Sequence, residues 1–177
     1  MRKSVLMSVM VVSIMMVYSV MAETNPSEKK EILNELKWLP CLSPESKEAG
    51  STAIIDSDGT FRASVKKGSA GFKEGVHHVQ FNTAVDLEIG KEYKLSFKLD
   101  TDANTLSNVA YFLSKPPYTF YFKKLIKFDK GEAEYSCQII PKSDDGKLSA
   151  HCILSFMLET CYGANIAIRD IKLKEKE

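Results

Sequence analysis

The segment Leu87-Glu-Ile-Gly-Lys-Glu-Tyr-Lys-Leu-Ser-Phe-Lys-Leu-Asp100 decides the fold class of this chain. Within it, the pair Gly90-Lys91 is a turn signal. From Tyr93 onward, polar residues alternate with four apolar residues, Tyr93, Leu95, Phe97 and Leu99. This two-residue period is typical of a strand with one buried face, and a helix cannot use it. We therefore expect a β-strand that packs against a second sheet.

Eight runs of β-type residues, of which this strand is the third, follow one another from Thr52 to the C-terminus. They are Phe61 to Lys66, His77 to Asn82, Tyr93 to Asp100, Val109 to Ser114, Thr119 to Lys124, Glu134 to Ile140, Leu148 to Leu158 and Asn165 to Lys174. Turn residues separate the runs, among them Pro116-Pro117 and Lys142-Ser-Asp-Asp-Gly146. Short strands at this spacing predict an all-β sandwich or barrel.

Eight strands in one domain are typical of a jelly roll, in which two four-stranded sheets face each other. Threading the runs in order places the first, third, sixth and eighth in one sheet and the others in the second. Alternation then predicts inward side chains at Val79, Phe81, Phe120, Phe122, Ala150, Cys152, Leu154, Phe156 and Leu158. It predicts outward side chains at His78, Gln80, Asn82, Tyr121, Lys123, His151, Ile153 and Ser155. The fourth run is apolar on both faces, so its orientation stays open.

Residues 1–22 have the features of a cleaved signal peptide. Arg2-Lys3 precedes an apolar run from Val5 to Val20, and Ala22 is small enough for cleavage before Glu23. The alternative is a retained membrane anchor, but the run is short for a span and is interrupted by three serines, Ser8, Ser13 and Ser19. No cysteine lies near the cleavage point, so a lipid-modified N-terminus is not expected. We expect a secreted or periplasmic protein with no membrane span after signal cleavage.

Residues 23–51 predict an N-terminal helix followed by a loop. Asn25-Pro26-Ser27 is a plausible cap, and Ile32, Leu33 and Leu36 follow at helical spacing. Pro40 and Pro44 are expected to end the helix, which leaves 41–50 as loop. Residues 52–177 are then expected to form one β-sandwich domain.

Removal of residues 1–22 leaves 155 of the 177 residues, enough for one domain with a substantial core. It also removes two of the 24 basic residues, so 22 basic side chains face 23 acidic ones. A net charge near −1 carries no nucleic-acid footprint.

Four cysteines, Cys41, Cys137, Cys152 and Cys161, favour disulfides in an exported protein and allow three connectivities. Cys137 and Cys152 fall on inward positions of consecutive strands in facing sheets, which suits an inter-sheet bond, and Cys41 with Cys161 would form the other. The alternative is that all four are small core residues. No spacing matches a CxxC zinc pair. The adjacent His77 and His78 must point to opposite faces, so only one of them could converge with His151. No third ligand is apparent, and a histidine metal site is therefore not expected.

Three segments carry a family resemblance: Val79-Gln80-Phe81, Leu87 to Phe97, and Ile166-Ala-Ile-Arg-Asp-Ile-Lys-Leu173. In this order they resemble exported carbohydrate-binding modules with a galactose-binding-like jelly-roll fold, a group often attached to bacterial xylanases and glucanases. The middle segment is similar to the signature L-x-x-Gly-Lys-x-Tyr-x-Leu-Ser-Phe. The last is similar to the closing strand, including a shift of apolar parity between Ile168 and Ile171. The resemblance spans about Phe61 to the C-terminus and implies this fold and a carbohydrate ligand.

The chain also departs from the family pattern. His77 stands where many members carry a tryptophan, and the only tryptophan, Trp38, lies outside the strands expected to bind sugar. Arg169 stands where the closing strand usually has an aspartate. Asp170 therefore remains as the one candidate ligand for the structural calcium that the resemblance implies. No other cofactor is expected.

Sugar binding requires apolar or aromatic faces together with amide and hydroxyl groups that exchange hydrogen bonds with a pyranose. The predicted open sheet, with the adjoining Pro116-Pro117 loop, supplies this mixture at His78, Gln80, Asn82, Tyr118, Tyr121, His151 and Ser155. The alternative to a sugar-binding face is an ordinary solvated sheet face without a ligand.

No catalytic motif is present in the sequence. Gly-x-Ser-x-Gly, His-Glu-x-x-His and phosphate loops are absent, and the acidic residues lie mostly in turns, as in Asp144-Asp145. The sequence therefore predicts a non-catalytic module that binds a polysaccharide or oligosaccharide on its open sheet face. The alternative is a protein-binding or cell-envelope structural module on the same fold without a sugar site.

Overall fold

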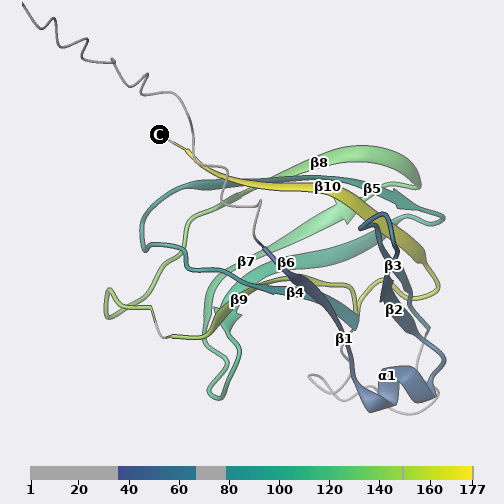
Figure 1. Cartoon of the computed structure of the whole chain (residues 1–177), viewed down its shortest axis with the longest axis horizontal. Coiled ribbons are helices and arrows are strands. Elements are labelled where there is room, and N and C mark those ends of the chain that lie inside the picture. The colour runs from purple at the N-terminus through teal and green to yellow at the C-terminus, as the bar shows by residue number, and fades with distance from the viewer. Residues whose placement is uncertain (1–35, 67–78, 149, 177) are drawn as a thin grey trace, which may run out of the picture.

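The computed structural model describes residues 36–66, 79–148 and 150–176 (Figure 1). These residues form ten strands and one short helix: β1 (Trp38–Leu42), α1 (Pro44–Glu48), β2 (Thr52–Ile55), β3 (Phe61–Ser64), β4 (Val79–Ala84), β5 (Tyr93–Thr101), β6 (Thr105–Leu113), β7 (Phe120–Phe128), β8 (Gly131–Ile139), β9 (Cys152–Met157) and β10 (Asn165–Glu175). All-β architecture is thereby confirmed, and each of the eight expected runs overlaps an observed strand.

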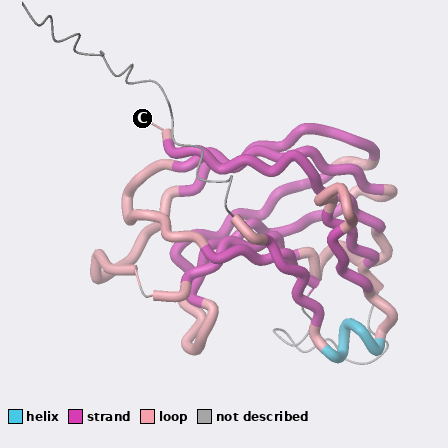
Figure 2. Tube along the Cα trace, in the orientation of Figure 1, coloured by secondary structure: helices cyan, strands magenta, loops and turns pink. Residues whose placement is uncertain are grey.

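The strands form two antiparallel sheets of five strands each. Sheet A has the order β2-β3-β10-β5-β8, and sheet B has the order β1-β4-β9-β6-β7. The two sheets lie one above the other as a sandwich (Figures 1 and 2). The predicted grouping is confirmed, because the first, third, sixth and eighth runs are β3, β5, β8 and β10 of sheet A. The other four runs are β4, β6, β7 and β9 of sheet B.

The segment that follows residue 37 corrects the sequence-based prediction. The structure places strand β1, not the end of a helix, at Trp38–Leu42, and helix α1 in the range expected to be loop. Proline is tolerated in edge strands, so Pro40 within β1 misled the prediction. Strand β2 was also missed, because four residues carry little periodic signal. The expected signal peptide and most of the expected helix lie outside the described residues. No helix in the described part of the chain is both long and apolar enough to span a membrane.

The core lies between the sheets and confirms the prediction made from β5. Leu95, Phe97 and Leu99 are at most 2% exposed. The Phe97 ring meets the ring of Phe156 on β9 edge to face, with centroids 4.9 Å apart, so β5 packs against the opposite sheet. Trp38 lies in the same core, 5.4 Å from Phe156 between ring centroids. The only tryptophan is therefore a core residue.

Tyr111 fixes the crossing from sheet B to sheet A. Its hydroxyl accepts a hydrogen bond from the Leu87 amide at 3.2 Å and donates one to the Val85 carbonyl at 3.1 Å. Burial raises the pKa of the Tyr111 hydroxyl well above its usual value. This buried side chain satisfies backbone groups that have no sheet partner where the chain leaves β4 for β5.

No disulfide joins the four cysteines, all of which lie within the described residues. The predicted pair fails because Cys137 lies on the edge strand β8, whereas Cys152 lies on β9, the central strand of sheet B. Cys161 instead donates to the Leu106 carbonyl at 3.3 Å, and Cys41 is exposed on β1. The alternative of small core residues holds for the three buried thiols.

Candidate functional site

The outer face of sheet B carries the residues that sequence reasoning assigned to ligand binding. Strand register aligns them in rows that cross the strands. One row is Leu39, Asn82, Ser155, Ala110 and Lys123; its neighbours are Cys41, Gln80, Met157, Asn108 and Leu125 on one side, and Ala84, Ile153, Phe112 and Phe120 on the other. Each row runs across several strands spaced about 4.8 Å apart, a span of roughly 19 Å for five. This length suits an extended ligand rather than a single small molecule.

Apolar side chains occupy the centre of this face. Ala110, Phe112 and Met157 form a hydrophobic cluster separate from the main core, with Ile153 packed against them. Phe120 extends the cluster at the end of β7, because its ring centroid lies 5.0 Å from that of Phe112. Phe120 is 44% exposed, so it offers an aromatic surface to solvent.

Polar side chains flank the apolar cluster on the β4 and β9 side. The Asn82 amide nitrogen donates to Gln80 Oε1 at 3.4 Å, and Asn82 pairs with Ser155 across the strands. Asn82 Oδ1 and Ser155 Oγ are buried without a hydrogen-bond partner among the described residues. Buried polar atoms are normally satisfied, so these two are candidates for bonding to a ligand.

Glu159 is a candidate site residue that the sequence analysis missed. It follows β9, and its Oε2 atom is buried without a hydrogen-bond partner among the described residues. Burial raises the pKa of this carboxyl to about 7, although Lys123 and a hydrogen bond with Gln80 oppose the increase. The available signal was its isolation, because it is the only Asp, Glu, Lys or Arg between Lys147 and Arg169.

Three predicted site residues are brought together on the outer face: Gln80, Asn82 and Ser155. The predicted inward side chains at Val79, Phe81, Cys152, Leu154, Phe156 and Leu158 are confirmed, since all are part of the main core. Ala150 is the exception, because it is exposed in the turn before β9.

The predicted orientations of Phe120 and Tyr121 are wrong. Phe112 pairs with Phe120 and Tyr111 pairs with Phe122, so Tyr121 is an extra residue in a β-bulge. The bulge turns Tyr121 into the main core, where its ring centroid lies 6.2 Å from that of Tyr111. Phe120 is turned outward instead. Phe122 still packs inward, as predicted.

The remaining predicted residues lie at one end of sheet B or outside the described residues. Tyr118 is exposed in the loop after the cis bond between Pro116 and Pro117, with a φ of 54°. His151 is exposed in the turn before β9, and its carbonyl accepts a hydrogen bond from Ser114 Oγ at 2.8 Å. His78 lies outside the described residues.

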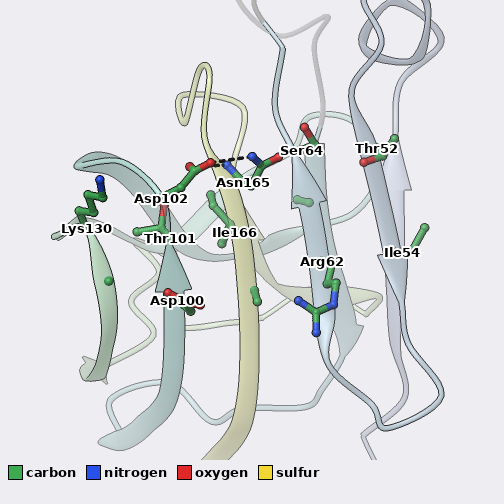
Figure 3. Close-up of a pocket in the computed structure, with 13 residues that line it drawn as sticks. Thr52, Ile54, Arg62, Ser64, Asp100, Thr101, Asp102, Lys130, Asn165 and Ile166 are labelled. Atoms are coloured by element: carbon green, nitrogen blue, oxygen red, sulfur yellow. Dashed lines mark hydrogen bonds between the residues drawn. The ribbon is translucent and has the colours of Figure 1, made fainter.

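The outer face of sheet A has a hollow of about 570 Å³, drawn in Figure 3. Its prominent polar groups already bind one another: Asp102 accepts from the backbone amide of Asn165 at 2.8 Å and from its side chain at 2.6 Å. These bonds lower the pKa of Asp102. Arg62 is paired with Asp56. Asp102 and Arg62 thus have partners in this hollow, whereas Asn82 Oδ1 and Ser155 Oγ on sheet B are buried without one among the described residues. Sheet B is therefore the stronger candidate.

The structure does not fit a calcium ion at Asp170. The Asp170 carboxylate lies 3.1 Å from the ammonium group of Lys98, and the adjacent Arg169 is paired with Glu132. Calcium needs six or more oxygen ligands. The side chains of Lys98 and Arg169 instead place positive charge where a calcium ion would lie. Within the described ranges, no group of three His, Cys, Asp or Glu side chains could hold a metal ion.

These features define a two-sheet antiparallel β-sandwich of the jelly-roll kind. Rows of polar and apolar side chains cross the outer face of sheet B, and Gln80, Ser155, Ala110, Phe112 and Met157 within them are buried. Solved carbohydrate-binding modules share this fold. One, described as a CBM4 structure, matches with a TM-score of 0.57 and 20% identity over 78% of this chain and 86% of its own. The BiXyn10A CBM1 module matches with a TM-score of 0.54 and 19% identity over 82% and 95%.

A further match is the N-terminal cellulose-binding domain of a β-1,4-glucanase from Cellulomonas fimi, with a TM-score of 0.52 and 12% identity over 79% of this chain and 89% of that domain. At these identities the comparison establishes the fold. No protein-family model matches the sequence, and no curated protein is significantly similar to it.

Proposed function

We propose that this protein is a non-catalytic module that binds a polysaccharide or oligosaccharide on the outer face of sheet B. The observation that carries the proposal is the pair of buried polar atoms without partners, Asn82 Oδ1 and Ser155 Oγ, beside an apolar cluster. A pyranose presents hydroxyl groups at its edge and C–H groups on its faces, so it can bond to the first and pack on the second.

Two further observations support this function. Two of the rows of side chains extend across all five strands, which suits a glycan chain laid over the sheet. The fold is also that of modules whose own descriptions name carbohydrate or cellulose binding. Exposed Phe120 and Leu125 add apolar contact area at the β7 side.

The proposal predicts binding without turnover. We expect the protein to be retarded in affinity gels that contain a soluble polysaccharide, and to release no reducing sugar from it. Asn82→Ala removes the Asn82 amide from the polar pair that it forms with Ser155. It is expected to weaken binding about tenfold, the loss typical of one hydrogen-bonded polar contact. Thr52→Ala, on the outer face of sheet A, is the matched control and should bind as the wild type does.

Retardation by no plant, microbial or host polysaccharide would overturn the proposal. Equal losses in Asn82→Ala and Thr52→Ala would instead locate binding away from sheet B. Urea unfolding of both variants confirms that each retains the fold.

A further inference from the structure

A second hollow, of about 640 Å³, lies where strand β7 begins, next to the proposed sugar face. It is lined by the start of β7 and by the loop that follows β8, with the residues Thr119, Phe120, Tyr121, Phe122, Lys123, Lys142, Ser143, Asp144, Asp145 and Lys147. The loop is attached to β7 because the Lys142 amide donates to the Tyr121 carbonyl at 2.8 Å. The hollow is therefore a feature of the fold and not of a detached loop.

Lys123 belongs to both the hollow and the sugar face. It pairs with Ala110 in the row that contains Asn82 and Ser155. Its ammonium nitrogen lies 5.0 Å from the centre of the Phe120 ring, a cation–π contact that holds the charge at this boundary. A chain bound along the row would therefore pass directly into the hollow.

The three lysines of the hollow form no ion pair with any described residue. Elsewhere, by contrast, Lys98 on β5 is paired with Asp170 at 3.1 Å, and Lys91 in the turn before β5 is paired with Glu88 at 2.8 Å. Lys123 is close enough to Glu159 to lower its pKa, so Lys142 and Lys147 are the ammonium groups most available to attract an anionic group of a ligand.

The hollow is nevertheless not purely basic. Asp145 accepts hydrogen bonds from Ser143 Oγ at 2.5 Å and from the Lys147 amide at 3.1 Å, and these bonds lower its pKa. With Asp144, the lining combines three ammonium groups, two carboxylates and hydroxyl groups. This mixture suits a ring that carries one carboxylate among several hydroxyl groups. A polymer of phosphates would be repelled by the two aspartates.

We propose that this hollow binds the carboxylate of a uronic acid unit, so that the ligand of sheet B is an acidic polysaccharide. The inference rests on the proposed function and names the substrate class of that site. Lys142 and Lys147 bind the carboxylate, and Phe120 packs against a sugar ring. Lys123 offsets the negative charge of the glycan where the glycan leaves the sheet.

The test compares acidic and neutral polysaccharides in affinity gels, with polygalacturonate and alginate as acidic probes and xylan and hydroxyethyl cellulose as neutral probes. We expect stronger retardation by an acidic probe, and a reduction at about 0.3 M salt, where the Debye length is only a few ångströms. The double variant Lys142→Gln/Lys147→Gln should weaken acidic binding about fivefold to tenfold and leave any neutral binding unchanged. The control Lys94→Gln/Lys172→Gln, on sheet A, should bind as the wild type does.

The outcomes separate the two proposals. Equal retardation by neutral and acidic probes, unaffected by the Lys142 and Lys147 changes, overturns the acidic-ligand inference and leaves sugar binding on sheet B standing. Retardation by no polysaccharide overturns both. Retardation of single-stranded DNA, lost in the same double variant and without acidic glycan binding, replaces the uronic acid by a phosphate ligand and also overturns the inference.

Discussion

Glu159→Gln should remove a pH dependence of stability that the wild-type protein shows between about pH 4.5 and pH 7. Burial raises the pKa of the Glu159 carboxyl from 4.5 to about 7 in the folded chain. In this interval the folded state holds a proton that the unfolded state has released. The free energy of unfolding therefore falls as pH rises, and the loss is complete above pH 7.

The magnitude follows from the difference between the two pKa values. Each pKa unit corresponds to about 1.4 kcal/mol, so the upper limit of the loss is about 3 kcal/mol. Part of the side chain is in contact with solvent, which screens the charge, so we expect about 1–3 kcal/mol. Lys123 and Gln80, which lower the pKa of Glu159, are included in this value.

Urea unfolding at pH 5, 6, 7 and 8 measures the effect. At pH 5 the wild type and Glu159→Gln should have similar midpoints, because the wild-type carboxyl is then protonated and resembles the amide. At pH 8 the variant should be more stable. Glu134→Gln, whose side chain is 81% exposed on the other sheet, is the control and should follow the wild type at every pH.

An identical pH profile for wild type and Glu159→Gln would refute the buried position of this carboxyl. A variant that is less stable than the wild type at pH 8 would also refute it, because it would mean that the ionised group is stabilised by partners. Either result would remove Glu159 from the candidate site.

Three further predictions concern the sandwich itself. Phe81→Ala should lower the free energy of unfolding by about 3–5 kcal/mol, because its ring is fully buried with its centroid 5.0 Å from that of Phe61. Leu125→Ala, at an exposed position, should change it by less than about 1 kcal/mol. Similar losses for the two variants in urea unfolding would contradict this core. Tyr111→Phe should cost about 1–3 kcal/mol by the same measurement, since two backbone groups lose their partner, and no loss would contradict that role. Unfolded, unreduced protein should bind four equivalents of a thiol reagent, and two or none would reveal disulfides.

Much of the fold could be predicted because strand signals are local. The alternation from Tyr93 to Leu99 depends only on neighbouring residues, and the turn residues between runs mark where each strand ends. Jelly-roll connectivity then placed eight strands in the correct sheets. The same alternation oriented Gln80, Asn82 and Ser155 toward the outer face.

The site depended on contacts that no local pattern records. The bulge that turns Tyr121 inward arises from the pairing of β7 with β6, and strand periodicity cannot reveal an extra residue. The partner of Asp170 is Lys98, which lies 72 positions earlier in the sequence.

The sequence by itself determined eight of the ten strands, their grouping and most of the faces that they bury, because backbone geometry repeats every two residues. Only the tertiary structure decided which outward side chains are left without partners, which lysines gather around the hollow at β7, and that Glu159 is buried. Burial and charge at one position are set by atoms from distant parts of the chain, so they exist only once the sheets have packed together.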